Sequence, residues 1–367
     1  MDKIKKLIII IIFIILVISA IMVVNKTSSI TNTTAKLQQT DEITIVPTMD
    51  DKITADSSWC GTFQLVWNDM KNEVVKKDII FKPQLDMVKN LNKEDFNESM
   101  ISEDYYFKAY GLKSLELKEN IENGIKEKFN QQSDILNDFD WSKSGLNNKY
   151  IRRYFFYVML YREFEFLQEF DKLESGKFGE KYNDVEYFGI DKNTKNSVGN
   201  QIDVLYYNSK DDFAIILNTK TNDEVIFCKN PQGKTFDEIY KNMNEEANKY
   251  DGNKKFEDLD EFKAPKLIFN KKREYTELEN IEFETADHNT VEIEKAIQTI
   301  EFSLDEKGGK VKSEAAIEAT DWTSVSKETK KQPRYFYIDD TFAIFLREKT
   351  KSRPYFAGRV NDIYKFQ

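Results

Sequence analysis

Residues 342–348 read Phe-Ala-Ile-Phe-Leu-Arg-Glu, and residues 355–360 read Tyr-Phe-Ala-Gly-Arg-Val. Both runs are rich in aromatic and branched apolar residues, which favour β-strands. The segment between them, residues 349–354, is short, charged and ends in Pro354, as is typical of a turn. The sequence therefore predicts a β-hairpin near the end of the chain.

A second strand pattern lies upstream of this hairpin. Ile300, Phe302 and Leu304 alternate with polar residues, and this period of two indicates a strand with one buried face. After Asp305-Glu306-Lys307-Gly308 the alternation resumes, and small or apolar residues stand at every second position: Gly309, Val311, Ser313, Ala315 and Ile317. A segment with this pattern could add itself as a strand to an existing sheet.

These motifs resemble those of the serpin family. Serpins end with an aspartate-containing turn, a phenylalanine-rich strand, a short charged turn and a strand reading Phe-Met-Gly-Arg/Lys-Val. Residues 337–342, Tyr-Ile-Asp-Asp-Thr-Phe, and residues 356–360, Phe-Ala-Gly-Arg-Val, resemble the first and last of these. Residues 305–308 are similar to the acidic, glycine-ended hinge that opens a serpin reactive loop.

Weaker matches extend the resemblance over roughly residues 60–360. Residues 154–161, Tyr-Phe-Phe-Tyr-Val-Met-Leu-Tyr, resemble the central sheet strand of serpins, and residues 262–267 resemble a later strand. Residues 78–83, Asp-Ile-Ile-Phe-Lys-Pro, are similar to the family's Asn-Ile-Phe-Phe-Ser-Pro. The resemblance implies an α+β fold with helices packed on antiparallel and mixed sheets.

The resemblance also implies a function and a site. Serpins inhibit proteases when the reactive loop is cleaved and its first part inserts into the main sheet. The loop here covers about residues 308–334, with Glu306, Lys307, Gly308 and Gly309 as its hinge. The inner face of the inserting strand consists of Val311, Ser313, Ala315 and Ile317.

Counting from the hinge places the scissile bond between Trp322 and Thr323, which suits a chymotrypsin-like protease. The loop is longer than expected, so three lysines are alternative bait residues for a trypsin-like protease: Lys327, Lys330 and Lys331. Lys310 and Lys312 depart from the small residues that follow the hinge in inhibitory serpins. A non-inhibitory serpin-fold surface protein with a binding or scaffold role therefore remains an alternative.

The amino-terminal segment predicts a membrane anchor or signal. Three lysines precede an apolar run over residues 7–24, long enough at about 1.5 Å per residue to cross the hydrocarbon core. The positive-inside rule then puts the body outside the cytoplasm. Cleavage after Ala20 would instead give a secreted protein. We expect a polar, disordered stalk over residues 25–56 and one serpin-like domain over residues 57–367.

Composition and motifs exclude several function classes. A formal net charge of −10 argues against nucleic-acid binding, and no phosphate-binding glycine loop occurs. With one histidine and two cysteines the chain lacks the ligands of a structural zinc site, and we expect no metal, cofactor or catalytic residues. We also expect a monomer.

One catalytic alternative remains open. Cys60 stands before a helical stretch, and His288 lies far downstream, in the order of a papain-like peptidase. The other interpretation makes Cys60 a small apolar residue before a helix with an apolar face. Cys60 and Cys228 either form one disulfide or stay buried free thiols.

Overall fold

The computed structural model describes residues 42–142, 146–148, 151–191, 196–311 and 333–367. Residues Gln39–Gln367 form one compact unit. The predicted anchor, residues 7–24, lies outside the described residues. Among the described residues, no helix is long and apolar enough to cross a membrane.

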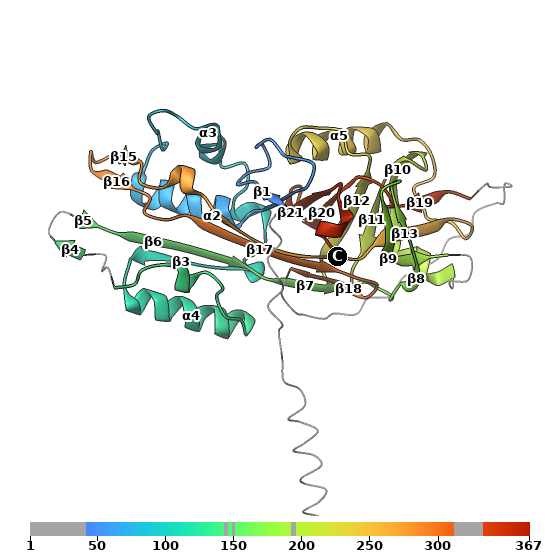
Figure 1. The fold of residues 1–367 in the computed structure, drawn as a ribbon, viewed down its shortest axis with the longest axis horizontal. Coiled ribbons are helices and arrows are strands. Elements are labelled where there is room, and N and C mark those ends of the chain that lie inside the picture. Colours follow the sequence, from blue (N-terminus) through green and yellow to red (C-terminus); the bar gives the residue numbers. More distant parts are fainter. Residues whose placement is uncertain (1–41, 143–145, 149–150, 192–195, 312–332) are drawn as a thin grey trace, which may run out of the picture. The chain divides into compact units, whose positions relative to one another are not determined.

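A seven-stranded sheet contains the terminal hairpin (Figure 1). Residues 342–348 and 355–360 pair as predicted, because their apolar side chains are buried on both faces of the sheet. The strands follow the order β1 (Thr44–Ile45), β2 (Ser57–Cys60), β21 (Pro354–Val360), β20 (Phe342–Glu348), β12 (Asp223–Lys229), β11 (Asp212–Asn218) and β10 (Ile202–Ser209).

A four-stranded sheet carries the hinge region. Its order is β14 (Leu267–Glu274), β17 (Ile297–Leu304), β18 (Gly308–Val311) and β7 (Arg162–Glu165). The alternation predicted for β17 is confirmed, because Gln298, Ile300, Phe302 and Leu304 are buried while the residues between them are half exposed.

The remaining sheets are smaller. A second four-stranded sheet has the order β19 (Tyr335–Tyr337), β13 (Glu261–Pro265), β9 (Tyr182–Ile190) and β8 (Asp171–Phe178). The two-stranded sheets pair β3 (Tyr106–Leu112) with β6 (Tyr154–Leu160), β4 (Leu146–Asn148) with β5 (Ile151–Arg152), and β15 (Glu282–Glu284) with β16 (Thr290–Glu292).

Four α-helices lie in the described residues: α2 (Thr62–Asp69), α3 (Asp86–Asn92), α4 (Leu115–Phe129) and α5 (Phe236–Lys249). A π-helix, η1 (Met70–Val75), continues α2. The side-chain hydroxyls of Ser114 and Thr235 cap the first turns of α4 and α5 by accepting backbone N–H bonds. The α2 and α4 helices lie on opposite sides of β6 (Figure 1).

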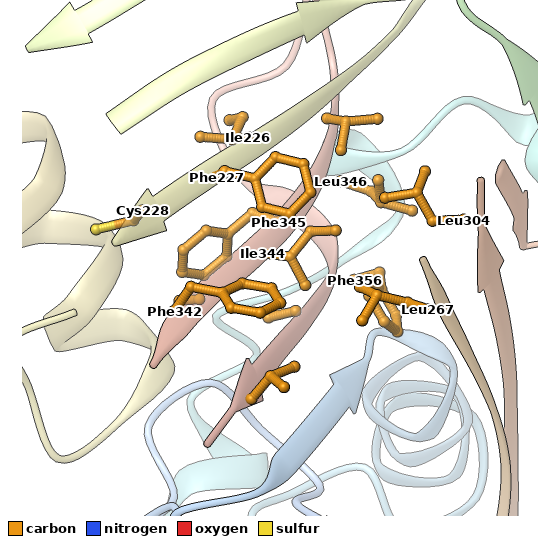
Figure 2. Close-up of a cluster of buried hydrophobic side chains, with 14 of the residues drawn as sticks. Ile226, Phe227, Cys228, Leu267, Leu304, Phe342, Ile344, Phe345, Leu346 and Phe356 are labelled. Atoms are coloured by element: carbon orange, nitrogen blue, oxygen red, sulfur yellow. The ribbon is translucent and has the colours of Figure 1, made fainter. Parts of the chain in front are cut away.

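The main core joins the seven-stranded sheet to β14 and β17. Figure 2 shows Leu267 and Leu304, from these two strands, beside Phe356 of the terminal hairpin. The Phe302 and Phe356 rings stack with centroids 4.6 Å apart. The stacked rings bury a large apolar area, so the terminal hairpin packs firmly against one face of the sheet that contains β14 and β17.

One sequence-based expectation needs correction. The folded unit begins before residue 57, because Ile43, Ile45 and Val46 are buried and β1 pairs with β2. Residues 42–56 thus belong to the packed body and not to the predicted stalk.

Candidate functional site

The hinge forms a tight turn that returns the chain into its own sheet. The Asp305 carboxylate accepts the backbone N–H bonds of Lys307 (2.8 Å) and Gly308 (3.3 Å). Gly308 has a φ of +156° and leads directly into β18. A Cβ at this position would lie 2.1 Å from the carbonyl oxygen of Phe164, so only glycine lets β18 lie this close to β7.

The first residues after the hinge form a strand of this sheet. The β18 strand pairs with β7 over its four residues, and Lys310 and Gly309 pair with Ser303 and Leu304 of β17. Lys310 also contacts Glu301 at 3.5 Å. Residues 308–311 therefore form a strand between two strands that run parallel to each other.

Glu306 holds the hinge by electrostatics. Its side chain is 4% exposed and forms ion pairs with Lys172 (3.1 Å) and Lys266 (3.2 Å). Burial by itself raises the pKa of Glu306, but a backbone N–H bond and the two lysines outweigh this effect and lower the pKa below its ordinary value. The Glu306 carbonyl oxygen accepts the backbone N–H of Phe170 at 2.9 Å.

A cavity of about 760 Å³ continues the line of β18. We call it the slot. Its walls are β6 and the part of β17 over residues 297–301, and its floor is α2, with Phe63 and Trp67. Among the described strands, β6 pairs with β3 alone, and β17 pairs with β18 only at residues 303 and 304. Within that part of the chain, two strand edges thus line the slot without a strand between them.

Unpaired strand edges have backbone donors and acceptors that a further strand satisfies. The wall side chains that point toward α2 are apolar on β6, namely Phe156, Val158 and Leu160. On β17, Gln298 donates to the Cys60 carbonyl oxygen and to Thr62 Oγ1, both at 3.0 Å, and accepts from Tyr275. The slot therefore has a mostly apolar inner face with its main polar group already satisfied.

A buried ion pair lies where β18 ends. Val311 pairs with Arg162, whose Nε donates to Asp223 at 2.7 Å. Asp223 also accepts from the Tyr355 hydroxyl at 2.9 Å, and the Arg162 guanidinium lies 3.7 Å from the centre of the Tyr105 ring. This cluster was missed from the sequence, although an arginine directly after the apolar run of β6 was a signal for it.

Cys60 and His288, the pair proposed for a papain-like peptidase, do not share a site. The Cys60 side chain is buried, and this burial raises the pKa of its thiol to about 11. His288 is 82% exposed in the turn between β15 and β16, where its Nδ1 lies 2.7 Å from Glu284. A protonated buried thiol and an exposed histidine paired elsewhere do not form a nucleophile and base. Both cysteines are free thiols.

The other predicted site residues lie outside the described residues. These are Ser313, Ala315, Ile317, Trp322, Thr323, Lys327, Lys330 and Lys331. Within the described part of the chain, no cluster of three or more His, Cys, Asp or Glu side chains could hold a metal ion.

Comparisons with known proteins were made on the sequence and on the structure. No protein-family model matches the sequence, and no curated protein matches it either. Solved structures of serpins are similar to this chain. Serpin48 from the insect Tenebrio molitor, described as highly specific, is 15% identical over 84% of this chain and 92% of its own, with a TM-score of 0.46.

Two further serpins give similar values. Mouse protein-Z dependent protease inhibitor is 12% identical over 84% of this chain and 91% of its own, with a TM-score of 0.48. Thyroxine-binding globulin, in complex with thyroxine, is 15% identical over 67% and 64%, with a TM-score of 0.39. This likeness concerns the fold alone. The helices and the mixed sheets of this chain themselves confirm the predicted α+β fold class.

Proposed function

We propose that the chain is a serpin-like protease inhibitor whose loop after β18 is cleaved by a target protease and then fills the slot. The observation that carries the proposal is β18 itself, a strand paired on both sides. Its carboxyl end adjoins the apolar slot. The slot lies between two strand edges that have no partner among the described strands. A strand that extends β18 into the slot would complete the sheet from β14 to β6.

Register supports this proposal. If the pairing of β18 with β17 continues, Ser313 comes opposite Ile300 and Ala315 comes opposite Gln298, both on the buried face. Opposite residues in a sheet point to the same side. The inner face would thus consist of the small residues that the sequence predicted: Val311, Ser313, Ala315 and Ile317.

In the same register, the two lysines that follow the hinge are compatible with insertion. Lys310 and Lys312 would point to the outer face, where Lys312 comes opposite Glu301. Opposite charges across a strand pair stabilise a sheet modestly, so the charged residues of the loop favour insertion.

The test is incubation of residues 39–367 with chymotrypsin-like and trypsin-like proteases, followed by denaturing gels. We expect an adduct that resists detergent, because insertion would carry the acyl-enzyme away from its active geometry. The new amino terminus would identify the bait as Trp322 or as one of the three lysines. Cleavage without an adduct would favour the non-inhibitory alternative.

We further propose that residues 7–24 tether the body outside the cell membrane. The apolar length and the preceding lysines support this localisation. External protease added to intact cells would then cleave the loop. Protection of the loop until the cells are lysed would contradict the proposed orientation.

A further inference from the structure

The strand β3 lies at the edge of a sheet, on the side of β6 that faces away from the slot (Figure 1). Among the described strands it pairs with β6 alone. This pairing is regular over all seven residues of β3, without a bulge, and the strand contains no proline. Proteins commonly protect a strand edge with bulges, prolines or charged side chains, because an open edge recruits another strand. The first two of these devices are missing from β3.

The hydrogen bonds at the two ends of β3 show which of its backbone groups point away from β6. Tyr161 donates its backbone N–H to the Tyr105 carbonyl oxygen at 3.0 Å. At the other end, the Lys113 N–H donates to the Arg153 carbonyl oxygen at 2.9 Å. Since backbone groups point to alternate edges along a strand, the odd-numbered residues of β3 bond to β6. The residues that turn their N–H and C=O groups to the outer edge are Tyr106, Lys108, Tyr110 and Leu112.

A charged side chain covers the start of this outer edge. Lys128 of α4 donates to the Tyr106 carbonyl oxygen at 2.8 Å. Further along, the Lys108 ammonium group donates to Asp69 of α2 at 2.8 Å and also contacts Glu98, so two carboxylates already engage it. The backbone groups of residues 108, 110 and 112 have no partner strand at this edge within the described part of the chain.

Large apolar side chains are exposed along the same segment. Tyr110, Leu112 and Leu115 are 42%, 37% and 68% exposed, respectively. The Tyr110 ring stacks on Phe156 of β6 with centroids 5.7 Å apart, so it is held in place at the surface. Exposed apolar groups that lie together mark sites of interaction. The outer edge of β3 therefore offers both hydrogen bonds and apolar surface to an extended partner.

The charges beside this edge favour a basic partner. Three carboxylates gather around Lys108 and Tyr110, namely those of Asp69, Glu73 and Glu98. Glu73 is exposed, and its contact with the Tyr110 hydroxyl raises the pKa of that group. A partner side chain opposite Lys108 or Tyr110 points to this same side of the sheet. Lysine or arginine there compensates the excess of negative charge.

We propose that the outer edge of β3 binds an extended segment of another protein, with lysine or arginine at every second position, as an added antiparallel strand. The basic residues of that segment lie opposite residues 108, 110 and 112 and exchange backbone hydrogen bonds with them. The inference goes beyond the proposed function, because β6 separates β3 from the slot. A second copy of this chain fits the edge less well, since pairing two such edges brings like charges together.

The test measures binding of a synthetic heptapeptide, Val-Lys-Val-Lys-Val-Lys-Val with blocked ends, to full-length protein by isothermal titration calorimetry. Leu112→Pro removes an outer N–H group and leaves the hydrogen bonds to β6, because this N–H points away from β6. We expect it to weaken binding about fivefold, the effect of one lost hydrogen bond. The matched control, Leu112→Ala, keeps the N–H group and binds within about twofold of the unmodified protein. Glu73→Gln weakens binding about two- to fivefold.

N-methylated peptides test the same geometry without changing the protein. A methyl group on the central lysine nitrogen, which faces β3, weakens binding about tenfold or more, because it removes a hydrogen bond and blocks close approach of the strands. A methyl group on the neighbouring valine nitrogen, which points away from β3, leaves the affinity within about twofold. A peptide with glutamate in place of lysine does not bind. Hydrogen exchange slows at the amides of residues 108, 110 and 112 when the lysine peptide is bound.

The outcomes decide both the site and its occupant. Equal weakening by both methyl groups, or equal binding of the lysine and glutamate peptides, overturns the added basic strand. Protection of residues 154–160 and 297–301 in place of β3 puts the peptide in the slot and overturns the β3 site, while the proposed insertion of the loop stands. A dimer that Leu112→Pro dissociates in sedimentation identifies a second copy as the occupant and overturns the basic segment.

Discussion

Replacement of Gly308 by alanine would test whether β18 needs glycine to lie between β7 and β17. A Cβ there would lie 2.1 Å from the Phe164 carbonyl oxygen and 2.7 Å from Glu165 Cα, and these are backbone atoms that cannot rotate away. A φ of +156° adds strain of about 1–3 kcal/mol for a residue other than glycine. We expect β18 to leave the sheet, because that relieves both the close approach and the strain.

The size of the effect follows from the hydrogen bonds that hold β18 in the sheet. The strand pairs with β7 over four residues, and each ladder hydrogen bond stabilises by about 1 kcal/mol net. Release of the strand therefore lowers the free energy of unfolding by about 2–4 kcal/mol, measured by urea denaturation. Hydrogen exchange at residues 308–310 and 303–304 is expected to rise in the same variant.

The matched control is Lys310→Ala in the same strand. Its side chain is 27% exposed and its ion pair with Glu301 is long, so the change costs less than about 1 kcal/mol. The proposed need for glycine is refuted if Gly308→Ala retains the hydrogen exchange of the unmodified protein at these residues and unfolds at the same urea concentration.

Three further predictions concern buried groups. Arg162→Met leaves the buried Asp223 carboxylate without its counter-ion and is expected to destabilise by about 3–5 kcal/mol in urea denaturation. Lys220→Met, at an exposed pair with Glu165, costs less than about 1 kcal/mol. Because the folded-state pKa of Glu306 is lowered, its contribution to stability is complete above the unfolded pKa of about 4.3 and is lost as the pH falls toward the folded value. Glu306→Gln is expected to remove that part of the acid dependence of the melting temperature. An unchanged acid dependence would contradict the lowered pKa of Glu306. Burial raises the pKa of the Cys60 and Cys228 thiols to about 11 and about 12, so a thiol reagent at pH 8 is expected to modify neither in the folded protein and both in denaturant; rapid labelling of the folded chain would contradict the packing described here.

Sequence patterns predicted those parts of the fold in which burial falls on one face or in which a long apolar run fills a strand. The terminal hairpin and β17 follow from their own residues, because alternation in β17 and continuous apolar character in β20 leave little choice of structure. The hinge glycines also marked the point at which the chain re-enters the sheet. All of these signals are local in the sequence.

The slot and the domain boundary could not be predicted in this way. Aromatic and aliphatic residues occupy both faces of β6, so the sequence does not show which of its edges a partner covers. Residues 42–56 are polar on average, yet Ile43, Ile45 and Val46 are buried because β1 joins an edge supplied by distant residues. The Arg162–Asp223 pair likewise joins side chains 61 positions apart.

Hydrogen exchange of the slot walls before and after cleavage shows whether the loop enters the slot. In the intact protein, we expect the slot-facing amides of residues 154–160 and 297–302 to exchange quickly, because these edges have no partner among the described strands. After cleavage within residues 312–332, we expect strong new protection in both segments together with a rise in melting temperature. Cleavage that leaves exchange unchanged in both walls would contradict insertion of the loop into the slot.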